Sequence, residues 1–191
     1  IGGDLFAIVW IEKEQKLYGL NASGRSPKSL TLEKLKQMGL EKIPVRGVLP
    51  VSVPGCVDGW FELNSKFGSL PMDKILSYAI HYADKGFPVS EVIADAWSSS
   101  EKTLVDMPGF SKTFLIDRKA PTKGEIFKNP YLANTLELIA EGGRDAFYKG
   151  EIARTIDVFM KEQGGFLSYE DLAMILTTSP STVKRDVYHL R

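Results

Sequence analysis

An arginine stands just after an apolar run, where a positive charge could bind an anionic ligand. The stretch LNASGRSP, residues 20–27, follows two short apolar segments and contains Arg25. A guanidinium group can bind a carboxylate through two parallel hydrogen bonds, so Arg25 is a candidate for substrate recognition. The same side chain could instead pair with Asp4, Glu12 or Glu14 at the protein surface. The residues alone leave both interpretations open.

Two other places have residue types used in nucleophilic catalysis. Cys56 follows a Pro-Gly pair near an expected helix start, where the helix dipole can lower the pKa of a thiol, although packing is the commoner role for such a residue. Residues 177–179 read Thr-Thr-Ser, and a threonine can act as a nucleophile once cleavage makes it an N-terminus. Only 14 residues follow Thr177, so we interpret this stretch as a linker.

Several common catalytic signatures are absent from the sequence. It contains no P-loop, no dinucleotide-binding GxGxxG, no HExxH zinc motif and no GxSxG nucleophile elbow. Of the 2 histidines, His81 lies among apolar helical neighbours and is expected to be a core or surface residue rather than a base. A single cysteine excludes an internal disulfide and a four-cysteine zinc site. We therefore expect no metal and no cofactor.

The composition is typical of a globular protein with balanced charge. The chain has 191 residues, 43% of them hydrophobic, with 24 Lys and Arg against 24 Asp and Glu. This balance argues against nucleic acid or an anionic membrane as partner, and no apolar run approaches the ~20 residues that span a bilayer. The single cysteine fits a reducing compartment, which favours a cytoplasmic location. The abrupt start at Ile1 and end at Arg191 indicate that residues are missing at both ends, so a signal peptide cannot be judged.

The elements that must position Arg25 are two strands followed by a long helical region. Residues 5–10 and 16–21 flank a charged turn and predict an antiparallel pair, with the first strand apolar throughout and therefore buried. A long irregular loop is expected at residues 106–125. Apolar periodicity and capping residues predict helices near residues 31–38, 57–67, 71–83, 88–97, 130–141, 151–162 and 168–173, and a last strand at 183–191.

Some details of these helices can be predicted as well. Asn129 before Pro130 is expected to be an N-cap, and Ser168 with Asp171 a capping box. In the helix at 71–83, we expect Ile75, Ala79 and Tyr82 to form an apolar face, because they are spaced as on one side of a helix.

Six blocks of this sequence resemble gamma-glutamyltranspeptidases, in the same order as in that family. They are IGGDLF, NASGRSP, SVPGCVDGW, KFGSLPMDKILSYAIHYADKGFPVS, AEGGRDAFYKGEIARTI and GGFLSYEDLA, which lie between residues 1 and 173. Their shared order makes the resemblance more specific than any single block.

The resemblance implies a fold class and an incomplete chain. The fold would be α+β, part of the four-layer αββα sandwich of N-terminal nucleophile (Ntn) hydrolases, to which this chain would supply a few antiparallel strands and most of the peripheral helices. Family precursors cut themselves into two subunits and expose a threonine at the start of the small one. Residues 1–191 would then be a single incomplete domain from the large subunit, with the remaining strands and the nucleophile beyond residue 191. The small subunit would be the partner, and association into a higher oligomer is left open.

The resemblance also implies an activity. Such a protein would transfer or hydrolyse gamma-glutamyl compounds such as glutathione by acyl transfer to the threonine, with no catalytic residue in this chain. A related amidohydrolase or acylase for a different acyl group is an alternative, and a non-catalytic helical interaction module is another.

The substrate-binding residues implied by the resemblance are Arg25 and Ser23. The family arginine that binds the α-carboxylate of the substrate matches the position of Ser23, and Arg25 comes two residues later. Along a strand this shift keeps the same face and moves a side chain by ~6–7 Å, and Gly24 would permit a turn toward the pocket. The NASGR form is similar to transpeptidase-like variants, some of which use other acyl groups.

Overall fold

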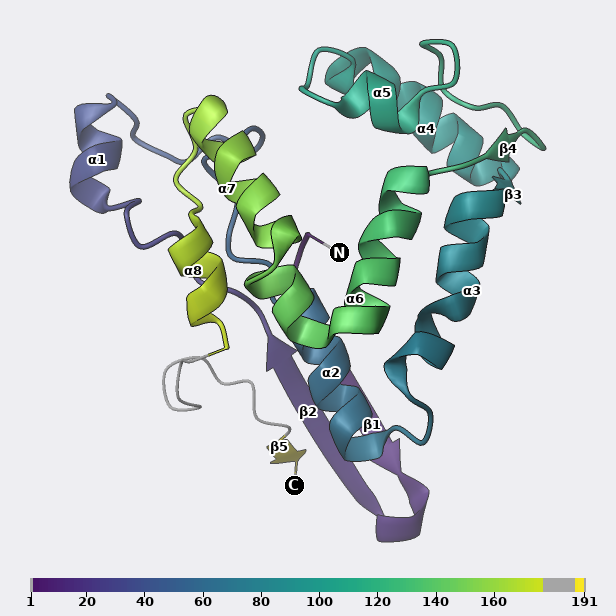
Figure 1. Ribbon diagram of the computed structural model, residues 1–191. Coiled ribbons are helices and arrows are strands. Elements are labelled where there is room, and N and C mark those ends of the chain that lie inside the picture. Colours follow the sequence, from purple (N-terminus) through teal and green to yellow (C-terminus); the bar gives the residue numbers. More distant parts are fainter. Residues whose placement is uncertain (1, 177–187, 191) are drawn as a thin grey trace. The chain divides into compact units, whose positions relative to one another are not determined.

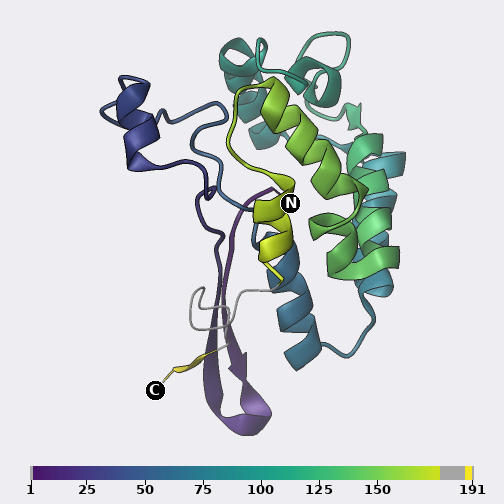
Figure 2. The same cartoon turned by 60° about the vertical axis from the view of Figure 1, so that its left-hand side comes forward.

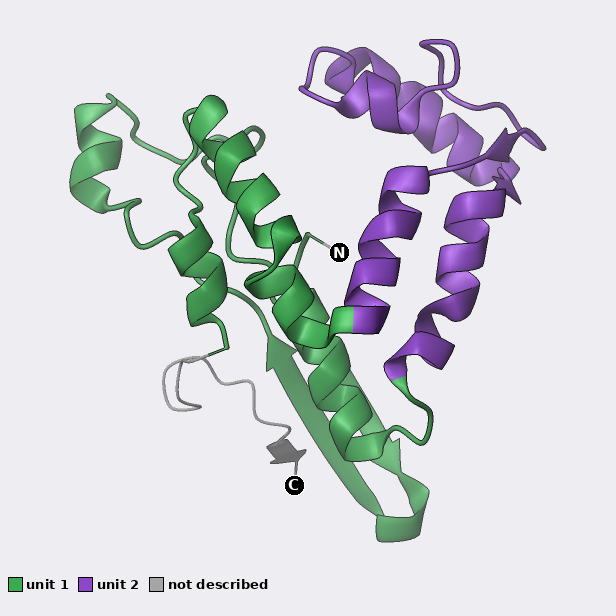
Figure 3. Ribbon diagram, in the orientation of Figure 1, with its two compact units in different colours: residues 1–71, 142–191 green, residues 72–141 purple. Residues whose placement is uncertain are grey.

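The computed structural model describes residues 2–176 and 188–190 and has an α+β architecture (Figures 1 and 2). It divides into two compact units, which are described separately: unit 1 contains residues 1–71 and 142–191, and unit 2 contains residues 72–141 (Figure 3). Within the described ranges, no helix combines the length and apolar character needed to cross a bilayer.

Unit 1 is built on the predicted antiparallel hairpin. Strand β1 (Leu5–Ile11) pairs with β2 (Lys16–Ala22) in a register that places Leu5 opposite Ala22, and the short 3-10 turn η1 (Glu12–Glu14) joins them. Strand β5 (Tyr188–Leu190) adds antiparallel to β2, giving the order β1-β2-β5. The predicted hairpin is confirmed, and β5 lies within the predicted last strand, of which residues 183–187 and 191 fall outside the described residues.

One face of this hairpin is covered by helix α2 (Cys56–Phe67), which lies along it in both views (Figures 1 and 2). Leu20 and Ala22 are buried on that face. On the opposite face Phe6, Ile8 and Trp10 expose 68%, 74% and 50% of their surface. The expectation that β1 is buried throughout is therefore wrong, because successive side chains point to opposite faces and only one face has a covering helix.

The contact between β2 and α2 depends on glycines. A Cβ atom on Gly55 would lie 2.0 Å from the carbonyl oxygen of Ala22. A Cβ atom on Gly59 would lie 2.7 Å from both Ala22 Cβ and Leu5 Cδ2. The start of the helix thus rests directly on the end of the strand, at a distance that no larger residue allows.

Of the remaining helices of unit 1, two have side-chain N-caps, Thr31 and Ser168, whereas another begins at Gly150 without one. The remaining helices are α1 (Leu32–Gln37), the last part of α6 (Pro130–Tyr148), α7 (Glu151–Glu162) and α8 (Tyr169–Met174). The predicted capping box of Ser168 and Asp171 is confirmed at the start of α8. The predicted helix end at the glycine pair is confirmed, because Gly143 is not helical (φ 67°, ψ −157°); α6 consists of one helix before this kink and a short second one that continues to Tyr148.

Unit 2 is a small helical layer with a two-stranded ladder. Its elements are α3 (Met72–Lys85), β3 (Phe87–Pro88), α4 (Glu91–Leu104), α5 (Phe110–Phe114), β4 (Ile126–Phe127) and the first part of α6. Its core gathers Val89, Ala94 and Phe127, with Trp97 packed against them. The predicted N-cap is confirmed, because Asn129 Oδ1 accepts a hydrogen bond from the Leu132 amide.

Two expectations for unit 2 are wrong. Residues 106–125 are not one irregular loop, because Gly109 (φ 80°) starts helix α5, whose Phe114 ring packs edge-on against Trp97. In α3 the buried residues are not those of the expected face. Ile75 and Tyr82 are exposed, and the helix instead buries Met72, Leu76 and Ala83.

The close approach of Gly55 to β2 predicts a measurable loss of stability. Gly55 has helical dihedrals (φ −90°, ψ −12°), so Gly55→Ala introduces no backbone strain and the clash with Ala22 decides the result. We expect the free energy of unfolding to fall by about 1–3 kcal/mol, as for other overpacked sites, measured by urea denaturation.

Gly3→Ala is the matched control, since a Cβ atom there would meet nothing within 4 Å. Equal stability of the two alanine variants would contradict the proposed backbone contact.

Candidate functional site

Arg25 lies in the segment that follows β2, and neighbouring backbone fixes its main chain. The amide of Val53 donates a hydrogen bond of 2.8 Å to the Arg25 carbonyl, and the amide of Gly24 donates one of 2.9 Å to Asp4 Oδ1. A Cβ atom on Gly24 would lie 1.5 Å from the Val53 carbonyl oxygen. The backbone of Gly24 is not left-handed, so the expected turn is not the reason for a glycine here. The reason is the close approach of the 53–55 segment.

The Arg25 side chain lines a cavity of about 230 Å³. Two cationic residues, one acid and one serine contribute to its wall, and three apolar residues, Val53 and two at the end of α8, form the rest. The residues that line it are Arg25, Ser26, Lys28, Val53, Asp171, Met174 and Ile175. An apolar pocket with a few charged groups is the usual form of a small-molecule site.

Among the described residues, Arg25 forms no salt bridge. The carboxylates that could have paired with it bind other groups: Asp4 accepts from the Gly24 amide, Glu12 from two nearby side chains, and Glu14 from the Tyr18 hydroxyl. The interpretation of Arg25 as half of a surface ion pair with one of these acids is therefore wrong. Its charge remains available to an external anion.

The buried carboxylate of Asp171 holds the far side of the segment. Asp171 Oδ1 accepts the Lys28 amide at 3.0 Å, while Oδ2 accepts the amide and hydroxyl of Ser168 at 3.0 and 2.8 Å. The same side chain therefore caps α8 and fixes the backbone three residues after Arg25. Because both of its carboxylate oxygens already accept hydrogen bonds, Asp171 has a structural role in the wall of the cavity.

Ser23, the other predicted substrate-binding residue, lies in a different setting. It is partly buried, and its amide and hydroxyl both donate to Asn21 Oδ1, at 3.0 and 2.7 Å. It is not among the residues that line the cavity with Arg25. The structure therefore does not bring the two predicted residues together, and the role of Ser23 stays a prediction.

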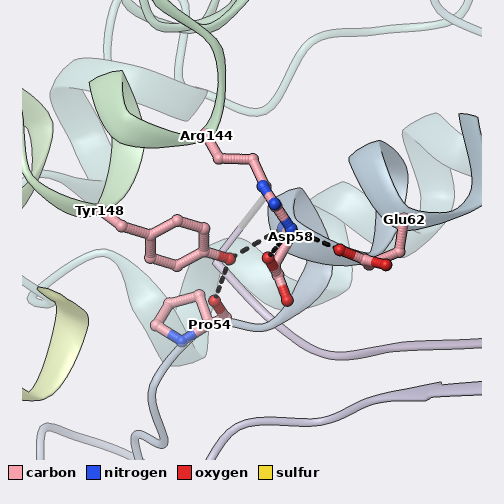
Figure 4. Close-up of polar contacts among 5 residues, drawn as sticks. All are labelled: Pro54, Asp58, Glu62, Arg144 and Tyr148. Atoms are coloured by element: carbon pink, nitrogen blue, oxygen red, sulfur yellow. Dashed lines mark hydrogen bonds and ion pairs between the residues drawn. The ribbon is translucent and has the colours of Figure 1, made fainter. Parts of the chain in front are cut away.

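The 53–55 segment that supports Arg25 is held by a tyrosine from α6 (Figure 4). Gly55 is the N-cap of α2 and has no side chain to accept from the first helical amides. The buried hydroxyl of Tyr148 takes this role: it accepts the Asp58 amide at 3.0 Å and donates to the Pro54 carbonyl at 2.7 Å. One hydroxyl thus satisfies a helix-end amide and a carbonyl just before it.

An ion-pair cluster lies beside this tyrosine (Figure 4). Arg144 Nη1 is 2.8 Å from Asp58 Oδ1 and 2.5 Å from Glu62 Oε1, and the Asp58 side chain is only 2% exposed. Burial alone would lower the pKa of Arg144, but the charge of Asp58 and the hydrogen bonds to both acids outweigh it and raise that pKa. The guanidinium therefore stays charged at any physiological pH.

Sequence reasoning missed this cluster, although a signal was present. Asp58 stands in the first turn of a predicted helix between small and apolar residues, where an acid is rarely buried without a partner. The matching cation, Arg144, is 86 residues away and directly follows the glycine pair. Only the tertiary fold shows that the two meet.

Neither Cys56 nor His81 gains support as a catalytic residue from the described structure. Burial raises the pKa of the Cys56 thiol, and nearby Asp4 raises it further, which agrees with the packing role expected for this residue rather than with an activated thiol. His81 is exposed and contacts Tyr82 edge-on, as a surface residue. Thr177 and the two residues after it lie outside the described residues. No group of three or more potential ligands in the described ranges could hold a metal ion.

A family model connects this geometry to known proteins. The gamma-glutamyltranspeptidase model matches residues 1–188, nearly the whole chain. This chain belongs to the gamma-glutamyltranspeptidase family. The resemblance of the six sequence blocks is thereby confirmed.

Curated relatives are longer than this chain. A glutathione hydrolase-like YwrD proenzyme of Bacillus subtilis is 37% identical over 175 residues, which cover 90% of this chain and 32% of that protein. An oxamate amidohydrolase proenzyme of Klebsiella pneumoniae is 35% identical over 178 residues, covering 90% of this chain and 33% of that protein. The chain thus spans about a third of the length of these relatives.

Solved structures give the same fold. A cephalosporin acylase from Bacillus halodurans is 42% identical with a TM-score of 0.85, covering 91% of this chain and 33% of that one. The gamma-glutamyltranspeptidase of Helicobacter pylori is 25% identical with a TM-score of 0.85, covering 99% of this chain and 52% of that one. The predicted fold class is confirmed: α+β, with the architecture of the corresponding part of the Ntn hydrolases of this family.

The raised pKa of Cys56 predicts slow alkylation. Because the thiol stays protonated at neutral pH, we expect iodoacetamide to modify Cys56 more slowly than a free cysteine at pH 7.5. The rate should rise as the pH is raised above the ordinary pKa of a thiol. Mass spectrometry of the native protein measures this, with urea-unfolded protein as the control for accessibility. Faster modification in the native state would instead indicate an activated thiol.

Proposed function

We propose that this chain is the large-subunit segment of a self-cleaving gamma-glutamyl transferase or hydrolase, acting on compounds such as glutathione. The observation that carries the proposal is Arg25, which has no ion-pair partner among the described residues, at the wall of a largely apolar cavity in a chain of this family. In this proposal Arg25 binds the substrate carboxylate. A guanidinium suits this task because it binds a carboxylate in a bidentate manner.

The nucleophile and the oxyanion donors lie in a second segment of the precursor. A threonine there attacks the amide carbon of the substrate while its N-terminal amine takes the hydroxyl proton. The amide C–N bond then breaks, the amine of the substrate leaves with that proton, and water or an amino acid later accepts the acyl group. The exposed apolar face of β1 supports this division, because Phe6, Ile8 and Trp10 need a covering layer that the described residues do not supply. The names of the relatives, which are proenzymes, agree with it.

A second candidate function is the hydrolysis of a different acyl amide. Arg25 stands two residues after the position of the family arginine, which Ser23 occupies here, so the carboxylate it binds need not be an α-carboxylate. Two of the relatives are an oxamate amidohydrolase and a cephalosporin acylase, which carry different names from the glutathione hydrolases. The same machinery would then serve another acyl group.

Self-cleavage is the first expected outcome for the full-length precursor. We expect it to separate into two fragments on a denaturing gel and then to release the chromophore of a gamma-glutamyl anilide. Alanine in place of the new N-terminal threonine should abolish both events. A folded precursor that stays uncut and inactive would contradict the proposal and favour a non-catalytic interaction module.

Arg25→Ala tests the substrate contact. Loss of a hydrogen bond to a charged group costs about 1.5–3 kcal/mol, so kcat/KM for a gamma-glutamyl anilide should fall about 10- to 100-fold. Arg25→Lys should recover only part of the loss, because an ammonium lacks the planar fork. Steady-state kinetics of the processed enzyme measure this effect.

The control is Arg46→Ala, which removes an exposed arginine that forms no salt bridge among the described residues. Pairs of anilides with and without the α-carboxylate separate the two candidate functions. If Arg25→Ala weakens both members of the pair equally, the group that Arg25 binds is not the α-carboxylate and the acylase function is favoured.

A further inference from the structure

We infer that the ion pair of Arg144 with Asp58 is a positioning device for Arg25. This inference rests on the proposed role of Arg25 in substrate binding. The path runs from the last part of α6 through the start of α2 to the segment after β2, and every step is a contact within unit 1; Figure 4 shows the steps up to Pro54.

The first step is the placement of the last turn of α6. The backbone of Gly143 is not helical (φ 67°, ψ −157°), so the helix before it cannot set the direction of the residues after it. Those residues need side-chain anchors of their own. Arg144 supplies one, with Nη1 2.8 Å from Asp58 and 2.5 Å from Glu62, both on α2.

The second step links this anchor to the 53–55 segment. Tyr148 is four residues after Arg144, so both side chains leave the same face of the helix. Its buried hydroxyl is 3.0 Å from the Asp58 amide and 2.7 Å from the Pro54 carbonyl. Arg144 holds the Asp58 side chain while Tyr148 holds its amide, and together they fix the start of α2 and the residues before it.

The third step reaches the candidate site. The Val53 amide donates to the Arg25 carbonyl at 2.8 Å, and Gly24 approaches Val53 so closely that no Cβ atom fits between them. A displacement of Val53 must therefore move the backbone of Arg25. The side chain is exposed and forms no ion pair with any residue in 2–176, so its direction depends on this backbone.

The ion pairs of Arg144 orient α2 relative to the last turn of α6 as well as stabilise the contact between them. One guanidinium nitrogen meets carboxylates from two successive turns of α2, which fixes both the position and the rotation of that helix relative to the last turn of α6. A packed apolar pair would tolerate sliding more easily, because dispersion contacts are not directional. A conservative Arg144→Lys change keeps the charge and one donating nitrogen but replaces the planar, rigid guanidinium with an ammonium on a flexible stem.

The test is a double-mutant cycle between Arg144 and Arg25 in the full-length, processed enzyme. We expect Arg144→Met to raise KM for the carboxylate-bearing anilide about 10-fold, equivalent to ~1.4 kcal/mol, with kcat changed much less. In an Arg25→Ala background the same substitution should add almost nothing, because both changes remove one contact. Arg144→Lys should restore part of the lost affinity.

Hydrogen exchange separates a local effect from a general loss of stability when it is compared with a variant that is destabilised elsewhere. Arg144→Met should speed amide exchange in a peptide covering residues 51–58. Leu136→Ala is the matched control, because it removes a buried side chain of α6 before the bend and destabilises the protein without touching this path. If Arg144→Met does not fold, Tyr148→Phe tests the same path by removing only the hydroxyl.

Two results would overturn the inference: unchanged exchange at residues 51–58, or KM effects of Arg144 and Arg25 that multiply independently. A normal KM in Arg25→Ala would instead overturn the proposed function. The exchange measurement still decides in that case whether Arg144 positions the segment.

Discussion

Backbone contact between the end of β2 and the start of α2 is the constraint on which unit 1 depends. At Gly24, Gly55 and Gly59 a single added carbon would come within 1.5 to 2.7 Å of neighbouring atoms. Strand end and helix start are therefore pressed together without intervening side chains. This one contact fixes the register of the hairpin, the path of the segment after it and the position of α2. Arg25, the candidate substrate-binding residue, lies next to it.

This close packing creates a difficulty that the rest of the unit resolves. A glycine N-cap leaves the first amides of α2 without a side-chain acceptor, and such amides are unfavourable when buried. Tyr148 supplies the acceptor from a distant part of the chain. The buried Asp58 adds a negative charge near the positive end of the helix, where the dipole favours it, but burial demands a cation, which Arg144 supplies. The start of α2 therefore depends on two side chains from the end of α6, Tyr148 and Arg144.

Local signals in the sequence predicted the local structure well. Two apolar runs on either side of a charged turn predicted the β1–β2 hairpin, and caps at Asn129 and Ser168 predicted helix starts that the structure confirms. Features that depend on tertiary contact were missed. An apolar stripe on a helix is not necessarily buried, as the exposed Ile75 shows. The pairing of Asp58 with Arg144 produces no periodic pattern in the sequence from which it could be predicted. Arg25 was found by its residue type, whereas its support was visible only in the fold.

The structure also changes how the position of Arg25 relates to the family arginine. The expected displacement of ~6–7 Å assumed that both positions lie on one strand, yet β2 ends at Ala22 and Arg25 follows in a non-strand segment. Alternation along a strand therefore does not determine its direction. What determines it is the hydrogen bond from Val53 and the close approach of Gly24, while Ser23 donates both its polar groups to Asn21. Substrate preference at this site would then depend on the 53–55 segment as much as on the arginine itself, because that segment decides where the guanidinium enters the cavity.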